Sequence, residues 1–141
     1  MCDCTRRAAV AGIAVAAAAV ATRSRAAAPD EHREFIAAAF KMKEDALRLG
    51  DQVFGAVVVK DGRIIGYGPS RVVLKQDAAA HAEREAIREA QARLGTGDLS
   101  GAVLYSSSRA CGACENAATE AKITRMFYGM DATDAGAPRR F

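Results

Sequence analysis

One histidine, one glutamate and two cysteines have the types and spacing of a metal-dependent catalytic site. His81 and Glu83 stand two residues apart, and Cys111 and Cys114 form a Cys-x-x-Cys pair further along the chain. One imidazole and two thiolates suit a tetrahedral zinc ion, and three protein ligands leave its fourth position open, as in catalytic zinc sites. The sequence therefore predicts a zinc ion held by His81, Cys111 and Cys114.

The position of Glu83 indicates a proton carrier and not a fourth ligand. Its face of the expected helix continues through Ile87, Ala90 and Leu94 at helical spacing, so its side chain points inward. An unpaired carboxylate inside a protein is costly, and proton transfer beside a metal is a reason to keep one there. Zinc lowers the pKa of its bound water to about 7, so the expected chemistry is hydrolysis with Glu83 moving the protons.

The pattern His-x-Glu followed by Cys-x-x-Cys resembles that of the zinc-dependent deaminases. The chain is similar to the cytidine deaminase-like superfamily, in particular to its guanine and nucleoside deaminase branch. Besides the zinc motifs, the similar segments are residues 54–62, 86–88 and 104–106, and the resemblance covers roughly residues 35–129. It implies a three-layer α/β/α sandwich around a mixed sheet of four to five strands, one zinc ion, and usually a homodimer. The activity it implies is hydrolytic deamination of a purine or pyrimidine base or nucleoside, with release of ammonia.

The candidate substrate-binding residues are Phe54, Ser70, Ala82 and Arg109. Phe54 begins a Phe-Gly-Ala stretch that the family also has, and its ring is either a wall on which the base stacks or an ordinary core residue. Ser70 stands where the family tends to carry an asparagine that holds the substrate. Arg109 can contact an acidic or carbonyl group of the substrate, or it can be an ordinary surface residue.

Two short segments depart from the family pattern beside the cysteines. Arg109 and Ala110 replace the Glu-Pro pair that usually precedes the first cysteine, and Gly112-Ala113 between the cysteines is smaller than usual. The zinc positions and Glu83 are unaffected, so the substrate is the open question.

Two other classes of function explain part of the pattern. In a redox module, Cys111 and Cys114 would cycle between dithiol and disulfide, but this leaves the His81-Ala82-Glu83 motif unexplained. In a non-catalytic zinc-binding domain, the metal site would remain without substrate turnover. Bound zinc argues against the first alternative, and turnover of a base argues against the second.

The elements that must position these residues follow from periodicity and turn residues. Asp61-Gly62 between two apolar runs predicts a hairpin, and Gly50 and Gly95 end helices. The expected helices cover residues 29–49 and 81–94 and a further stretch from Cys111; the expected strands cover residues 53–60, 63–68, 102–106 and 123–129. Alternating helices and strands predict an α/β layered fold with a mixed sheet.

Within the helix that begins at His81, three charged residues are expected to face solvent. These residues are Glu85, Arg88 and Glu89. Residues 69–80 before this helix are expected to form a loop that leads to the site.

Charge is distributed unevenly along the 141 residues. The net charge of +3 comes from the first 28 residues, because from Pro29 onward 16 Lys and Arg face 16 Asp and Glu. A neutral domain lacks the basic surface expected of a nucleic-acid-binding protein. The sequence therefore favours a small-molecule substrate over a nucleic-acid partner.

Residues 1–28 have the features of an export signal ahead of a single domain at residues 29–141. Arg6-Arg7 precedes an alanine-rich apolar run at residues 8–21, which is 14 residues long and shorter than the roughly 20 that a membrane span needs. Paired arginines before such a run resemble a twin-arginine signal, and Ser24-Arg25-Ala26 favours cleavage after Ala26. The alternative is an alanine-rich helix at the start of a cytoplasmic protein.

We expect the mature protein to be exported, in a periplasm-type compartment, and without its first 26 residues or so. Cell fractionation with mass spectrometry of the N-terminus in the native host checks this. Replacing Arg6-Arg7 with Lys-Lys should retain the protein in the cytoplasm. Full-length protein found in the cytoplasm alone would support the alternative.

Overall fold

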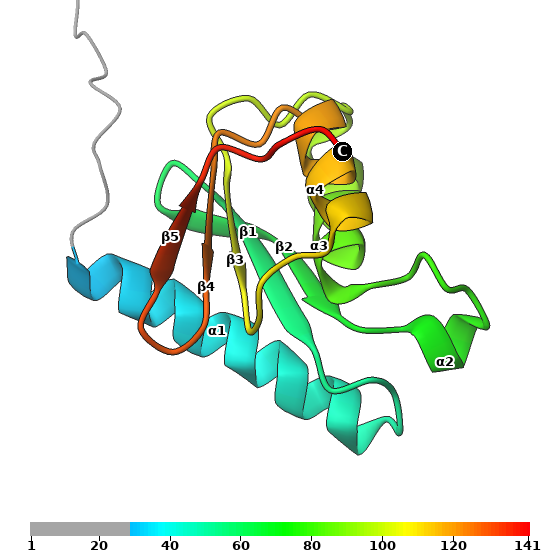
Figure 1. The fold of residues 1–141 in the computed structure, drawn as a ribbon. Helices are drawn as coiled ribbons and strands as arrows, with labels where there is room; N and C mark the ends of the chain where they lie inside the picture. The colour runs from blue at the N-terminus through cyan, green and yellow to red at the C-terminus, as the bar shows by residue number, and fades with distance from the viewer. Residues whose placement is uncertain (1–28) are drawn as a thin grey trace, which may run out of the picture.

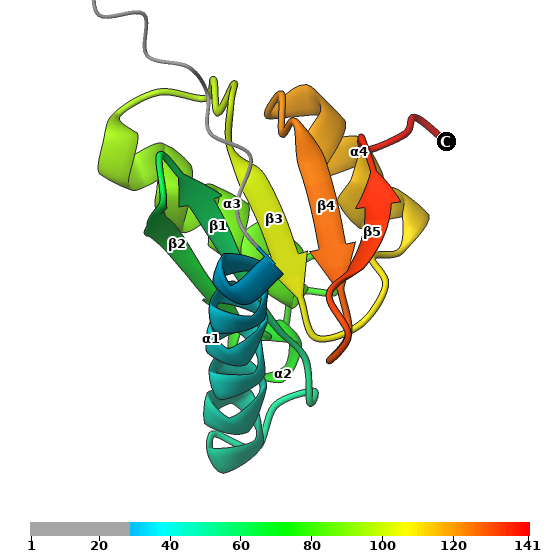
Figure 2. The same cartoon turned by 90° about the vertical axis from the view of Figure 1, so that its left-hand side faces the viewer.

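The computed structural model describes residues 29–141, which form a central sheet between two layers of helices (Figure 1 and Figure 2). The helices are α1 (Pro29–Arg48), α2 (Val72–Lys75), α3 (Ala82–Leu94) and α4 (Gly112–Glu120). The strands are β1 (Gly55–Lys60), β2 (Arg63–Pro69), β3 (Val103–Ser106), β4 (Arg125–Tyr128) and β5 (Thr133–Gly136). The export signal predicted at residues 1–28 lies outside the described residues and stays a prediction. Among residues 29–141, no helix is long and apolar enough to span a membrane.

The five strands form one mixed sheet in the order β2-β1-β3-β4-β5. Only the β3–β4 pair is parallel, and α4 provides the crossover between these two strands. The β1–β2 hairpin turns at Asp61 and Gly62, whose φ angles of 52° and 74° are the positive values that such a tight hairpin turn needs. The expected mixed-sheet architecture and the predicted hairpin are both confirmed.

The two faces of β1 explain its continuous apolar run. Val57 and Val59 pack with Phe35 and other residues of α1, whereas Ala56 and Val58 belong to the cluster that covers α3 and α4. Every second side chain of a strand points to the opposite face, so a strand covered on both sides is apolar throughout. Figure 2 shows α1 on one side of the sheet with α3 and α4 on the other, which confirms the α/β/α sandwich.

Two glycines of β2 let α3 lie against the sheet at backbone distance. A Cβ atom on Gly68 would lie 2.0 Å from the carbonyl oxygen of Ala82, and one on Gly66 would lie 2.1 Å from that of Ala86. No other residue type fits at such distances. These glycines therefore set the position of the helix on which Glu83 lies.

Glu85 is buried, so its expected exposure was wrong. Its carboxylate lies 2.6 Å from Nζ of Lys75 and 2.7 Å from a guanidinium nitrogen of Arg88, with Arg71 at 4.0 Å. The predicted loop at residues 69–80 contains the short helix α2, which places Lys75 against α3. Cations from this segment make the burial of the carboxylate tolerable.

Asp51, which follows α1 in the loop before β1, holds the start of α2 by hydrogen bonds. One carboxylate oxygen accepts the backbone N–H groups of Val73 and Leu74 at 3.0 and 2.9 Å. The other accepts the Ser70 hydroxyl at 3.0 Å and the N–H of Gln52 at 2.7 Å. Burial alone would raise the pKa of Asp51, but these donors outweigh burial and lower it.

We expect Asp51→Asn to destabilise the protein by about 1–3 kcal/mol, because an amide group would face N–H donors. The carboxylate's contribution exists above pH about 4, the ordinary pKa of an aspartate, and is lost as the pH falls through the lowered folded-state pKa. The variant should therefore lose less stability than the wild type on acidification. Urea unfolding at several pH values measures both effects.

The matched control is Asp61→Asn in the exposed hairpin turn, where asparagine suits the positive φ. It should leave stability nearly unchanged. Equal losses in the two variants would contradict the role given to Asp51.

Candidate metal centre

The three predicted zinc ligands come together at the N-termini of two helices. His81 is the residue that precedes α3, Cys111 is the residue that precedes α4, and Cys114 lies in the first turn of α4. Their ligand atoms all lie within 4.8 Å of one another. Cys114 is buried, His81 is half-buried and Cys111 is exposed.

The spacing of these atoms fits a zinc ion. Zn–N and Zn–S bonds of about 2.05 and 2.3 Å at a tetrahedral angle separate nitrogen from sulfur by about 3.6 Å. His81 Nδ1 lies 3.5 Å from Sγ of Cys114 and 3.7 Å from Sγ of Cys111. Both cysteines are free thiols, so their sulfurs are available to an ion.

The environment of Cys114 couples metal binding to proton release. Burial raises the pKa of the Cys114 thiol, and the nearby charge of Glu83 raises it further. Without an ion this thiol therefore carries its proton, and a zinc ion displaces that proton when it binds the thiolate.

Glu83 lies beside the cluster and is only 7% exposed. Its Oε2 lies 3.6 Å from Sγ of Cys114. Burial raises the pKa of the Glu83 carboxyl above its ordinary value, against smaller lowering effects from backbone donation and from the Cys114 thiol. Ile87 and Ala90 are buried on the same helix face as predicted, but Leu94 is 41% exposed because it lies at the end of α3.

The predicted substrate-binding residues occupy different environments. Phe54 is 45% exposed, so its interpretation as a core residue was wrong. Ser70 and Ala82 are fully buried, and the Ser70 hydroxyl donates to Asp51. Arg109 is exposed. The roles of these four residues toward a substrate stay predictions.

Sequence analysis missed Asp51, which orients Ser70 and α2. A signal was available: an aspartate directly after Gly50, the glycine that ends the first helix, can accept free backbone donors. Its partners lie about 20 residues further along the chain, so the sequence does not identify them.

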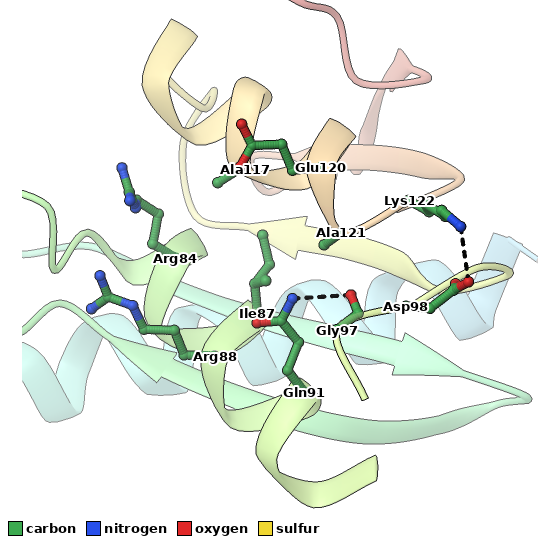
Figure 3. A pocket seen from close by; sticks show the side chains of 10 residues that line it. All are labelled: Arg84, Ile87, Arg88, Gln91, Gly97, Asp98, Ala117, Glu120, Ala121 and Lys122. Atoms are coloured by element: carbon green, nitrogen blue, oxygen red, sulfur yellow. Dashed lines mark hydrogen bonds and ion pairs between the residues drawn. The ribbon is translucent and has the colours of Figure 1, made fainter. Parts of the chain in front are cut away.

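A groove of about 450 Å³ lies between α3, α4 and the turn that follows α3 (Figure 3). Ile87, Ala117 and Ala121 form its apolar part, while Arg84 and Glu120 stand at its sides. None of the three candidate ligands lines it. The groove therefore lies apart from the predicted chemistry.

Comparison with known proteins supports this reading of the cluster. Residues 29–130 match the family model described as the cytidine and deoxycytidylate deaminase zinc-binding region. Over 82 residues the chain is 44% identical to guanine deaminase of Bacillus subtilis, a match that covers 58% of this chain and 53% of that protein. It is 41% identical over 83 residues to the tRNA-specific adenosine deaminase of Agrobacterium fabrum, covering 59% of this chain and 55% of that protein.

A solved structure has the same fold. The X-ray structure of guanine deaminase from Bacillus subtilis superposes with a TM-score of 0.67 and 37% identity, covering 70% of this chain and 63% of that one. The chain thus spans about half the length of the curated relatives named here.

We expect the purified protein to carry about one zinc ion per chain. His81→Ala and Cys114→Ser should each lower zinc affinity by more than about 100-fold. Residues that only orient a ligand contribute up to about 100-fold, so the loss of a ligand itself should cost more. Elemental analysis and chelator competition measure this. His32→Ala is the matched control, because His32 is the only other histidine and its Nδ1 pairs with the Tyr105 hydroxyl. If the active protein contained no zinc and had Cys111 and Cys114 joined as a disulfide, the assignment of these residues as zinc ligands would be wrong.

Proposed function

The chain belongs to the family defined by the cytidine and deoxycytidylate deaminase zinc-binding region, and on that premise we propose that it catalyses zinc-dependent hydrolytic deamination of a purine or pyrimidine base or nucleoside. One observation carries the proposal. The buried Glu83, with its raised pKa, lies against one of three side chains whose spacing fits an open zinc site. A purely structural zinc site needs neither an open position nor a buried acid beside it.

The reaction divides between the ion and the chain. Zinc, when bound by His81, Cys111 and Cys114, supplies a Lewis acid that makes water a nucleophile near neutral pH. Glu83 would accept one proton from the attacking water and pass it to the ring nitrogen. It would then take the remaining proton of that oxygen and deliver it to the leaving amine, so the two protons of water account for both transfers. The products are ammonia and a base with a carbonyl in place of the amino group.

Burial of Glu83 suits both proton transfers. A carboxyl with a raised pKa holds a proton more firmly than an ordinary one, so it can accept and then return it. No Lys or Arg within residues 29–141 pairs with it.

Within this class we propose a small free base such as guanine as the substrate. The two relatives named above differ in substrate, one a guanine deaminase and one a tRNA-specific adenosine deaminase. From Pro29 onward positive and negative side chains balance, which supports a small substrate over tRNA. The exposed ring of Phe54 supplies an apolar surface on which a base can stack.

Two proposals about the whole protein accompany the activity. We propose a homodimer, as the family resemblance implies, and light scattering on the purified chain tests it. Export stays a proposal based on Arg6-Arg7 and the apolar run at residues 8–21.

Ammonia release from a panel of guanine, adenine, cytosine, their nucleosides and a tRNA anticodon stem-loop tests the proposed activity. Guanine is expected to be turned over fastest. Turnover of the stem-loop alone would favour a tRNA substrate. Zinc-loaded protein that turns over none of them, nor any related aminopurine or aminopyrimidine, would favour the non-catalytic zinc-binding alternative.

We expect Glu83→Gln to lower turnover by about 10²–10⁴-fold, because the amide keeps the shape of the side chain but cannot accept a proton. Zinc content should stay near that of the wild type. Glu89→Gln on the same helix is the matched control, since Glu89 pairs with Arg93 at 3.0 Å on the outer face. Loss of zinc together with activity would assign Glu83 a role in holding the metal, and full turnover would refute the proton-transfer role.

A further inference from the structure

The chain from residue 138 to residue 141 returns from β5 to lie along α4, the helix that carries both sulfur ligands (Figure 1). We call residues 138–141 the strap. Nothing in the sequence pattern predicts this contact, since it joins residues 24 and 25 positions apart.

The strap is attached to the two residues that directly follow Cys114. The backbone N–H of Arg139 donates to Oε2 of Glu115 at 3.0 Å, and the Arg139 guanidinium lies 3.5 Å from the same oxygen. Asn116 bonds the backbone of Phe141 twice, accepting its N–H at 2.9 Å and donating to its carbonyl at 3.4 Å. The Glu115 side chain is only 8% exposed, so its carboxylate depends on the strap for its charged partner.

The same segment covers the residue between the two sulfurs. A Cβ atom on Gly112 would lie 3.3 Å from Cγ of Phe141, tighter than ordinary contact. The Arg139 guanidinium lies over the Phe141 ring at 5.4 Å from its centroid. The small residue between the cysteines, unusual for the family pattern, is therefore the one that leaves room for the Phe141 ring.

The first turn of α4 is held by the core at Cys114, while its outer side is open to solvent. Cys111 and Ala113 are exposed, and Cys111 makes no side-chain cap bond to the helix. A helix of nine residues is marginal by itself, and helix ends open first. Opening of this turn would move both sulfurs away from His81.

We propose that the strap is a positioning element for the metal centre: its contacts with Gly112, Glu115 and Asn116 hold the Cys111–Cys114 turn in the geometry that retains zinc. The inference rests on the metal site and not on the deaminase activity. Partners that orient ligand-bearing groups typically contribute 10–100-fold in metal affinity.

The first test compares Glu115→Ala and Phe141→Ala with matched exposed controls, Glu120→Ala on the same helix and Met130→Ala in the β4–β5 turn. Chelator competition on the zinc-loaded chain measures affinity and the dissociation rate. We expect a loss of about 10–100-fold in each strap variant and less than about twofold in the controls. Unchanged affinity in both strap variants, or equal losses in the controls, would overturn the proposal.

Cobalt substitution separates positioning from general stability. The intensity and energy of the cobalt–thiolate absorption bands report ligand geometry, so they should change in the folded strap variants and stay constant in the controls. Wild-type spectra in both strap variants would indicate a structural role alone. Zinc affinity and cobalt spectra need no substrate, so their outcome is independent of whether ammonia is released.

The contact between Gly112 and Phe141 allows a second test. Gly112→Ala should weaken zinc binding in the wild-type chain, because the new methyl group displaces the ring. In Phe141→Ala the tight contact with Cγ at 3.3 Å is gone, and the nearest remaining contact given by that residue is its Cβ atom at 3.5 Å, an ordinary distance. The double variant Gly112→Ala/Phe141→Ala should therefore bind zinc as tightly as Phe141→Ala alone. If instead the losses of the two single variants add up in the double variant, the Gly112–Phe141 contact is not the cause of the weaker binding.

Discussion

The three ligand atoms of the metal centre can meet only if the N-termini of α3 and α4 lie side by side. The strand order provides this. Both β2 and β3 run antiparallel to β1, which lies between them, so they are parallel to each other and end at the same edge of the sheet. α3 follows β2 through the α2 segment, and α4 follows β3 directly, so both helices start near that edge. Sites in open α/β sheets typically form at the carboxyl ends of strands for this reason.

Buried carboxylates show where this chain departs from ordinary packing. Asp51 accepts backbone N–H groups, Glu85 pairs with Lys75 and Arg88, and Glu115 pairs with Arg139. Each of these charges is compensated by donors or cations, as burial requires. Glu83 differs, because the side-chain partner the structure shows for it is the Cys114 thiol. Glu83 is the buried carboxylate whose partners leave its pKa raised, and it is the one that lies at the metal centre, where such perturbed groups are typical of function.

The segments around the centre restrain it from two sides. On one side, Asp51 and Glu85 fasten α2 and the chain leading to His81. On the other, the strap lies along α4 next to both cysteines. Metal sites depend on such outer contacts, because these fix the orientation of the ligands before the ion arrives. Two positions that differ from the family pattern contact these restraining segments: Ser70 donates to Asp51, and Gly112 lies against Phe141 of the strap.

The sequence by itself determined what depends on neighbouring residues. The Asp61-Gly62 turn, the apolar run of β1 and the periodicity of α3 are local signals, and the structure has the elements that they predicted. The types of His81, Glu83, Cys111 and Cys114 were enough to propose the metal and the proton carrier, because few ions suit that ligand set.

Tertiary structure alone decided which charges are buried and what restrains the centre. Glu85 was expected in solvent because helical periodicity places it away from the apolar stripe, yet its carboxylate is buried and pairs with Lys75 at the end of α2. Asp51 and the strap find their partners about 20 to 25 residues away along the chain. Such contacts depend on how whole elements pack, and local propensity carries no information about that packing.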